Sequence, residues 1–153
     1  ATLLLLPYLL AAQASAWLYL RRLPAFIMVD RHLAIGSKNA PASKHWHALL
    51  DLATEFPAQR RAGGHYRSLP ILDLTVPSAD TIREALAFIR QHHGEQPVCV
   101  HCALGLSRSA TIAAAWLLHR GLAQNAHEAF SQLQKMHPAI VWSEAHERVV
   151  NAA

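Results

Sequence analysis

The sequence predicts an α/β domain in which a central, mixed but mostly parallel sheet is flanked by helices. Beyond Leu23-Pro24, short apolar runs bounded by Gly, Pro and Asn alternate with segments whose apolar residues recur at helical spacing. One run, Pro97 to His101, is apolar up to its last residue, which is typical of a strand in the middle of such a sheet. The length of 153 residues suits one domain with one core.

Three further strands are expected before this central one. Residues 33–36 form a short apolar run that ends in glycine, and residues 48–53 form a second run. Residues 65–72 are the third candidate, and the polar residues 59–64 separate them from the second. The strands therefore alternate with loops and helices along the chain.

Four helices are expected from their caps and their apolar spacing. Ser78 suits an N-cap, and Gly94 stops the helix that follows it. A second helix runs from about residue 109 to 121, a third begins at Asn125 with capping-box spacing, and a fourth begins at Ser143. The residues expected to face inward are Ile82, Ala85, Leu86, Ile89, Ala113, Trp116, Leu117, Phe130, Leu133, Met136, Val149 and Val150.

Charge and cysteine content narrow the functional classes. The net charge of +4 comes from 14 basic and 10 acidic residues without a long basic run, so it favours anionic ligands weakly and gives no argument for nucleic acid. Two cysteines, Cys99 and Cys102, exclude a disulfide framework and indicate a reducing compartment. The 11 histidines lack the spacing of metal ligands, so no metal is expected.

An uncharged stretch covers residues 2–20 and ends at Arg21-Arg22. It is long enough to span a bilayer, and the flanking arginines would place the following domain on the cytoplasmic face of that membrane. A helix packed on the domain and a signal peptide are the alternatives. We therefore divide the chain into a hydrophobic segment, residues 1–25, which is a membrane-helix candidate, and a folded domain, residues 26–153.

The segment from His101 to Ser109 carries the chemistry. It places five residues between a cysteine, Cys102, and an arginine, Arg108, and it lies between a buried strand and a helix N-terminus. The amides of such a loop can all point at one anion, and together with the helix dipole they stabilise both a bound phosphate and a thiolate. Gly105 permits the tight turn. The pattern predicts a phosphate-binding loop with a nucleophilic thiolate.

Each position of the loop has an expected role. Arg108 would hold two phosphate oxygens with its planar fork, and Ser109 would donate to the Cys102 sulfur when that sulfur leaves. His101 is expected to orient the loop backbone. No metal or cofactor is needed in this scheme, because the amides and the arginine neutralise the phosphate. The phosphate-binding positions are Ala103, Leu104, Gly105, Leu106, Ser107 and Arg108.

These residues closely resemble the dual-specificity branch of the protein tyrosine phosphatases, whose signature is HCxxGxxRS. The resemblance extends to Leu33–Ser37, which is similar to the family's opening strand, and to Leu69–Asp73, which is similar to its general-acid segment. It covers the chain from about Phe26 to the C-terminus. The resemblance implies a protein tyrosine phosphatase-like fold, hydrolysis through a phosphocysteine intermediate, and a catalytic domain over residues 26–153.

The resemblance assigns the general acid to Asp73, which lies 29 residues before Cys102 and directly after a predicted strand. Asp80 is the competitor, but it falls in a first helical turn, where a carboxylate serves the helix dipole. Cys99 forms a C-x-x-C with Cys102. We interpret it as a core residue of the strand, with a reversible protective disulfide as the alternative.

The variable loop positions bear on the substrate. Ala103, Leu104 and Leu106 are uncharged, whereas relatives that act on inositol lipids tend to be basic there, so a singly phosphorylated group is expected. Phosphotyrosine, phosphoserine or phosphothreonine in a protein is the first hypothesis. The alternatives are a lipid or small-molecule phosphomonoester, kept open by residues 2–20, and a phosphate-binding module without turnover.

Overall fold

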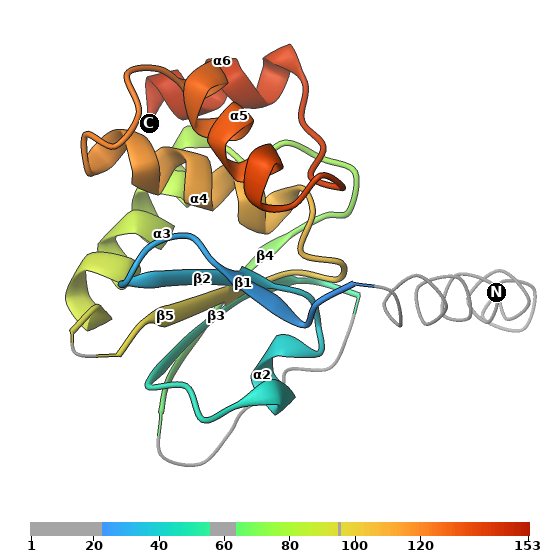
Figure 1. Cartoon of the computed structure of the whole chain (residues 1–153), viewed down its shortest axis with the longest axis vertical. Helices are drawn as coiled ribbons and strands as arrows, with labels where there is room; N and C mark the ends of the chain where they lie inside the picture. The colour runs from blue at the N-terminus through green and yellow to red at the C-terminus, as the bar shows by residue number, and fades with distance from the viewer. Residues whose placement is uncertain (1–22, 56–63, 95) are drawn as a thin grey trace, which may run out of the picture.

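A five-stranded sheet crosses the middle of the molecule in the order β1-β2-β5-β3-β4 (Figure 1). The computed structural model describes residues 23–55, 64–94 and 96–153. Four strands run parallel, and only the edge strand β1 is antiparallel to its neighbour β2. The predicted mixed, mostly parallel sheet is thus confirmed. The strands are β1 (Phe26–Met28), β2 (Leu33–Gly36), β3 (Ala48–Ala53), β4 (His65–Ile71) and β5 (Val98–His101).

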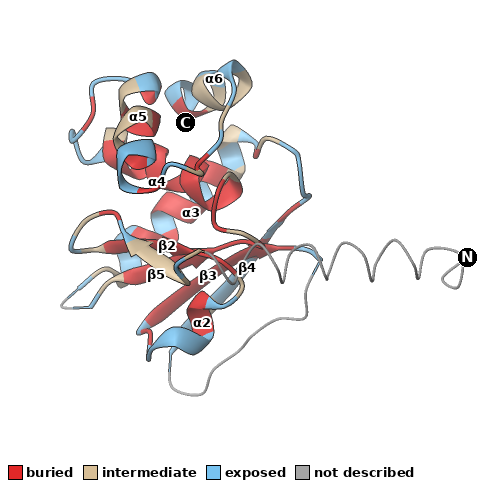
Figure 2. Ribbon diagram, turned by 45° about the vertical axis from the view of Figure 1, so that its right-hand side comes forward, coloured by how far each residue is buried: buried red, intermediate tan, exposed pale blue. Residues whose placement is uncertain are grey.

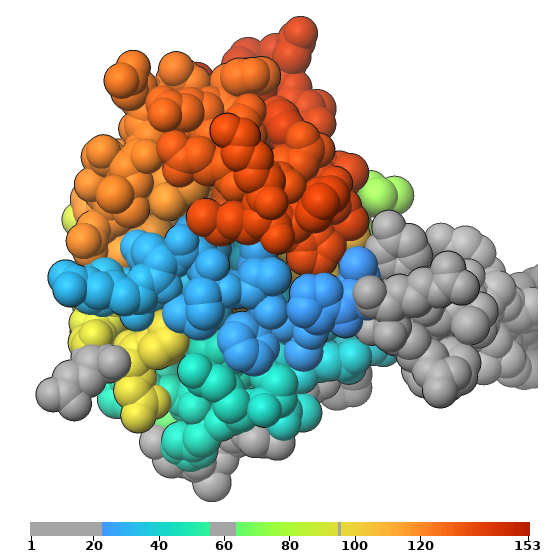
Figure 3. All heavy atoms as spheres, in the orientation of Figure 1, coloured from blue at the N-terminus to red at the C-terminus, as the bar shows by residue number. Residues whose placement is uncertain are grey.

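Helices cover both faces of the sheet unequally. One face carries α3 and α4, and the last two helices pack over α4, whereas the short helix α2 lies on the opposite face (Figures 1 and 2). In the space-filling view, β1 and β2 separate this helical layer from the α2 side (Figure 3). The helices are α2 (Ala40–Ser43), α3 (Ala79–His92), α4 (Arg108–His119), α5 (Ala126–Met136) and α6 (Glu144–Ala152).

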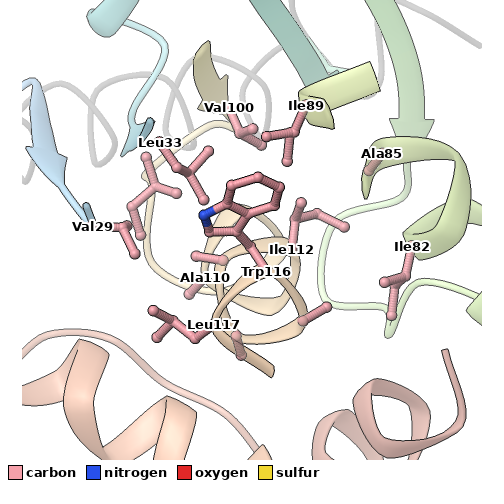
Figure 4. Close-up of a cluster of buried hydrophobic side chains, with 14 of the residues drawn as sticks. Val29, Leu33, Ile82, Ala85, Ile89, Val100, Ala110, Ile112, Trp116 and Leu117 are labelled. Carbon is pink, nitrogen blue, oxygen red and sulfur yellow. The ribbon is translucent and has the colours of Figure 1, made fainter. Parts of the chain in front are cut away.

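The main core lies between the sheet and the helical layer. Trp116 of α4 is fully buried among aliphatic side chains from the sheet and α3, including Leu33, Val100 and Ile89 (Figure 4). Its indole Nε1 donates to Asp30 Oδ2 at 2.8 Å, which satisfies the buried polar atom. A smaller cluster around Trp46 fills the other face under α2. The chain therefore buries both faces of its sheet, as parallel strands require.

The expected elements appear with small shifts at their ends. Strands β2 and β3 coincide with the predicted runs, and the N-caps are confirmed: Ser78 Oγ accepts from Thr81 N at 3.1 Å and Asn125 Oδ1 accepts from Glu128 N at 2.9 Å. The inward orientation of Met136 was wrong, since its side chain is 46% exposed. It is the last residue of α5, and the next residue, His137, is buried instead, so the end of the helix turns the Met136 side chain away from the core.

Two elements were not predicted, β1 and α2. Strand β1 has three residues and α2 has four, which is too short for a periodic pattern to show in the sequence. The segment of residues 2–20 and most of the predicted polar loop of residues 59–64 lie outside the described residues. Within the part of the chain that is described, no helix is both long and apolar enough to cross a membrane.

Candidate active site

The parallel strands bring their carboxyl ends to one edge of the sheet, and each is followed by a residue of interest. Ser37 follows β2, Glu55 lies two residues after β3, Asp73 two residues after β4, and Cys102 directly after β5. Ligands of open α/β sheets bind at this edge, where chains from neighbouring strands diverge. The predicted nucleophile and acid are therefore brought to one place although 29 residues separate them in sequence.

The loop from Cys102 to Arg108 curls around the cysteine sulfur. Cys102 is buried, and its Sγ accepts from the Gly105 amide at 3.2 Å and lies 3.5 Å from Ser109 Oγ. The Gly105 amide and the Ser109 hydroxyl are therefore both within hydrogen-bonding distance of this sulfur. Backbone hydrogen bonds to other segments of the protein hold the loop in place. They run from Cys102 N to Gly36 O at 3.2 Å, from Lys38 N to Ala103 O at 3.1 Å and from Val141 N to Leu106 O at 3.1 Å.

Gly105 has the left-handed backbone expected of the turn, with a φ of 81°. A Cβ at this position would lie 2.7 Å from the carbonyl carbon of Gly36 in the adjacent strand. The loop thus needs glycine for two reasons, its backbone conformation and the close approach of another main chain.

Arg108 begins α4 and turns its guanidinium towards the carboxyl ends of β3 and β4. Nη1 donates to Glu55 Oε2 at 2.9 Å and to Ile71 O at 2.9 Å, and Nη2 donates to the other Glu55 oxygen. Asp73 Oδ1 lies 3.0 Å from the same Nη2. A buried guanidinium held by three partners has little rotational freedom, so Arg108 is oriented before any ligand arrives.

Arg108 and Glu55 each stabilise the charged form of the other. Burial alone would raise the pKa of Glu55, but the hydrogen bond from Arg108, backbone hydrogen bonds and the guanidinium charge lower it to about 2. Burial acts to lower the pKa of Arg108, yet Glu55, Cys102 and Asp73 together raise it above its ordinary value. Both groups of the Arg108–Glu55 pair therefore remain charged over the physiological range.

Glu55 is a site residue that sequence reasoning missed. The available signal was its place just after a buried strand, at the same sheet edge as the loop. Asp51, inside β3, was also missed: it is buried, accepts from Tyr66 OH at 2.9 Å, and lies 3.7 Å from His101 Nε2. An aspartate within an otherwise apolar strand was the sequence signal there.

The structure separates the two candidate acids. Asp73 stands at the loop mouth with 63% of its side chain exposed, beside Arg108. Asp80 lies in the first turn of α3, is 93% exposed, and pairs with Arg83 of the same helix. Only Asp73 therefore shares a site with Cys102, Arg108 and Ser109.

His101 and Cys99 end up in different surroundings. His101 is buried beneath the loop, where burial lowers its pKa while Asp51 and the Cys102 backbone act in the opposite direction. Cys99 packs in the small cluster on the α2 face, whereas Cys102 packs with the main core. Burial raises the pKa of the Cys99 thiol, with Lys44 opposing it, so its thiolate form is disfavoured.

A pocket of about 250 Å³ opens beside Arg108. Its polar lining comes from Asp73, Ser107, Arg108, Ser143 and His146, and its apolar lining from Leu74, Val141 and Trp142. No group of three or more His, Cys, Asp or Glu side chains in the described ranges is placed to hold a metal ion. The arrangement offers a thiol, a guanidinium and a carboxylate to one anionic ligand.

Comparison with known proteins shows which family the chain belongs to. The family model described as "Dual specificity phosphatase, catalytic domain" matches residues 34–153. The chain belongs to this family. Its membership in the protein tyrosine phosphatase superfamily agrees with the fold, and the matched residues include the Cys102 loop, Arg108 and Asp73. A search of curated protein sequences gave no match.

Solved structures of dual-specificity and related phosphatases share the fold. PTPMT1 in complex with PI(5)P superposes with a TM-score of 0.73 at 20% identity, covering 84% of this chain and 94% of that one. The active form of Tk-PTP gives a TM-score of 0.69 at 24% identity, with 84% and 95% covered. Human DUSP28 gives 0.68 at 19% identity, with 85% and 95% covered. At these identities the likeness establishes the architecture.

Proposed function

We propose that this dual-specificity phosphatase domain hydrolyses phosphomonoesters in two steps through Cys102. In the first, the thiolate attacks phosphorus, an S–P bond forms and the P–O bond breaks, while Asp73 gives its proton to the leaving oxygen. In the second, water attacks the phosphocysteine, the S–P bond breaks, and inorganic phosphate and the thiolate are released. Asp73, now ionised, takes the proton from that water, so the cycle closes without a metal or cofactor.

One observation carries this proposal: the Cys102 sulfur lies at the centre of the loop with the Gly105 amide and Ser109 Oγ directed to it. Ser109 is suited to stabilise the sulfur as it departs from phosphorus. The loop amides would donate hydrogen bonds to the phosphate oxygens, and His101, buried below the loop, would orient the loop backbone. These roles follow from chemistry at the observed positions.

Arg108 and Asp73 also imply a change on substrate binding. In the structure the two side chains pair at 3.0 Å. A phosphate dianion in the loop would compete for Nη2, so it would displace the Asp73 carboxylate towards the leaving oxygen. Its negative charge would also favour the protonated carboxyl that an acid needs. Glu55 would keep Arg108 in place during this exchange.

Two substrate classes remain in view. The uncharged Ala103, Leu104 and Leu106 support a singly phosphorylated group, with phosphotyrosine, phosphoserine or phosphothreonine in a protein as the first candidate. A lipid phosphomonoester is the second, and the structure adds an observation in its favour, because Leu74 and Val141 expose apolar side chains in the pocket beside Arg108. A module that only binds phosphate would have no use for Ser109 or Asp73.

An aryl phosphate assay tests the reaction. With Cys102 reduced, the full chain is expected to hydrolyse para-nitrophenyl phosphate at pH 6, and Cys102→Ser to lower kcat on the order of a thousandfold or more. Cys99→Ala is the matched control and should keep the rate, since that thiol packs away from the loop. Absence of hydrolysis by the reduced wild-type chain would support the binding module instead.

A further inference from the structure

Three large aliphatic side chains are exposed on the two chain segments that border the pocket beside Arg108. Leu72 and Leu74 flank the acid Asp73 and are 67% and 99% exposed, and Val141, between α5 and α6, is 59% exposed. Leu74 and Val141 line the same pocket. Among the residues that the structure describes, six large apolar side chains are exposed, and three of them lie on these two segments. We call Leu72, Leu74 and Val141 the apolar rim.

Leu74 adopts a backbone conformation that a leucine seldom takes. Its φ is 61°, in the left-handed region, and no other non-glycine residue in the described ranges has a positive φ. This conformation is unfavourable for a residue with a Cβ, and the leucine gains no burial in return. Strain together with full exposure indicates that the side chain meets something absent from the isolated chain.

The other side of the loop adjoins the start of the described chain. Pro24 and Phe26 border a small crevice together with Leu104 and Gly105 of the loop. In Figure 1 the chain enters the domain at the same end as the β4–α3 and α5–α6 connections, which carry the apolar rim. The described chain therefore begins beside the active-site mouth, and only Arg21 and Arg22 separate its first residue from the uncharged residues 2–20 in the sequence.

We propose that the active-site mouth docks on a phospholipid bilayer, with the apolar rim in the interface, and that this docking selects the second of the two substrate classes above, a phosphomonoester carried by a lipid in that bilayer. The rim supplies apolar contact, and the net charge of +4 supplies attraction to anionic lipids. The start of the described chain beside the loop agrees with this orientation, because the uncharged residues 2–20 come shortly before it in the sequence. The docking is argued from the apolar rim, and the substrate assignment rests on the proposed function.

Hydrogen–deuterium exchange of the full chain measures docking without any turnover. With vesicles of phosphatidylcholine and phosphatidic acid, amides in residues 72–75 and 140–143 are expected to exchange several-fold more slowly than without vesicles. Residues 121–124 are the internal control, because Leu122 is also exposed but lies past the opposite end of α4. Full exchange at the rim in vesicle-bound protein would overturn the docking.

Hydrolysis tests the substrate class. Phosphatidic acid in these vesicles is compared with glycerol 3-phosphate, which carries a similar phosphomonoester without acyl chains. In the double variant Leu74→Asn and Val141→Thr, the new side chains suit the local backbone conformations. This variant should lower the ratio of kcat/KM for phosphatidic acid to kcat/KM for glycerol 3-phosphate roughly tenfold. Leu122→Asn, which also removes an exposed apolar side chain but lies away from the mouth, should leave the ratio unchanged.

The outcomes separate the two proposals. An equal loss on both substrates, or hydrolysis of a phosphotyrosyl peptide with none of the vesicle lipid, would overturn the lipid substrate while the phosphatase reaction stands. Rim protection in a chain that hydrolyses none of these phosphomonoesters would leave the docking supported, reject the lipid-phosphatase assignment and reject the proposed function.

Discussion

At the scale of single residues, the site depends on how Arg108 is fixed. Its guanidinium is buried, and Glu55 and the Ile71 carbonyl hold both terminal nitrogens. A phosphate therefore meets an arginine that has already lost its side-chain freedom, which lowers the entropic cost of binding. Glu55 acts here as a positioning residue, since it reaches a ligand only through Arg108.

The Glu55 carboxyl makes the free energy of unfolding depend on pH in the acidic range. Its pKa in the folded chain is about 2, below the ordinary 4.5, so its contribution is complete above about pH 4.5 and is lost as pH falls towards 2. Glu55→Gln is expected to lower the free energy of unfolding at pH 7 by about 1 kcal/mol, because solvent around the partly exposed carboxyl screens its interaction with Arg108, and to flatten its decline between pH 5 and 2. Urea titrations across this range measure both effects. Glu84→Gln, which removes an exposed partner of Arg67, should cost less than about 0.5 kcal/mol.

Asp73 carries a prediction about pH and rate. If its carboxyl protonates the leaving oxygen, Asp73→Asn lowers kcat at pH 6 on the order of a hundredfold and removes the decline of kcat at high pH. The loss should be larger for alkyl than for nitrophenyl phosphates, because a nitrophenolate leaves without a proton. Asp80→Asn is the control and should leave the profile unchanged; the reverse pattern would assign the acid to Asp80.

At the scale of elements, the caps define where the helices begin. Asn125 starts α5 by accepting from Glu128 N, and Ser78 starts α3 in the same way from Thr81 N. These side chains satisfy amides that the first helical turn leaves unpaired. This local chemistry is visible in sequence, which is why the starts of α3 and α5 were predicted more securely than their ends.

Removal of the α5 cap should be measurable by thermal unfolding. Asn125→Ala is expected to lower the free energy of unfolding by about 1 kcal/mol, because the Glu128 amide loses its acceptor. Asn125→Asp keeps an acceptor oxygen and should restore most of the stability. Equal losses in the two variants would mean that the side chain stabilises α5 in some other way.

At the scale of the whole molecule, Trp116 ties the helical layer to the sheet. It is fully buried, and its indole reaches Asp30 in the turn between β1 and β2. Trp116→Phe should cost about 2 to 3 kcal/mol, because it leaves a space and an unpaired Asp30 oxygen. Trp142→Phe removes a similar hydrogen bond, to Glu147, from a half-buried ring and should cost less. Chemical denaturation of Trp116→Phe and Trp142→Phe measures the two losses in the free energy of unfolding.

The sequence predicted those parts of the fold that depend on local pattern. Strands β2 and β3, the N-caps Ser78 and Asn125, and the loop beginning at Cys102 each have a signal within a few neighbouring residues. Strand β1 and helix α2 were missed because three or four residues are too few to show a period. Met136 was misplaced because helical spacing alone did not show that the next residue, His137, is the one buried at the end of α5.

What the sequence determined by itself was the chemistry of the loop, since the spacing of Cys102, Gly105, Arg108 and Ser109 is fixed within one turn of chain. Only the tertiary structure decided which residues from other segments surround that loop. Glu55 and Asp73 lie just after β3 and β4 and contact Arg108 because parallel strands end at one edge of the sheet, and Val141 of the α5–α6 connection lines the same pocket. Contacts between distant segments follow from packing, which no local pattern records.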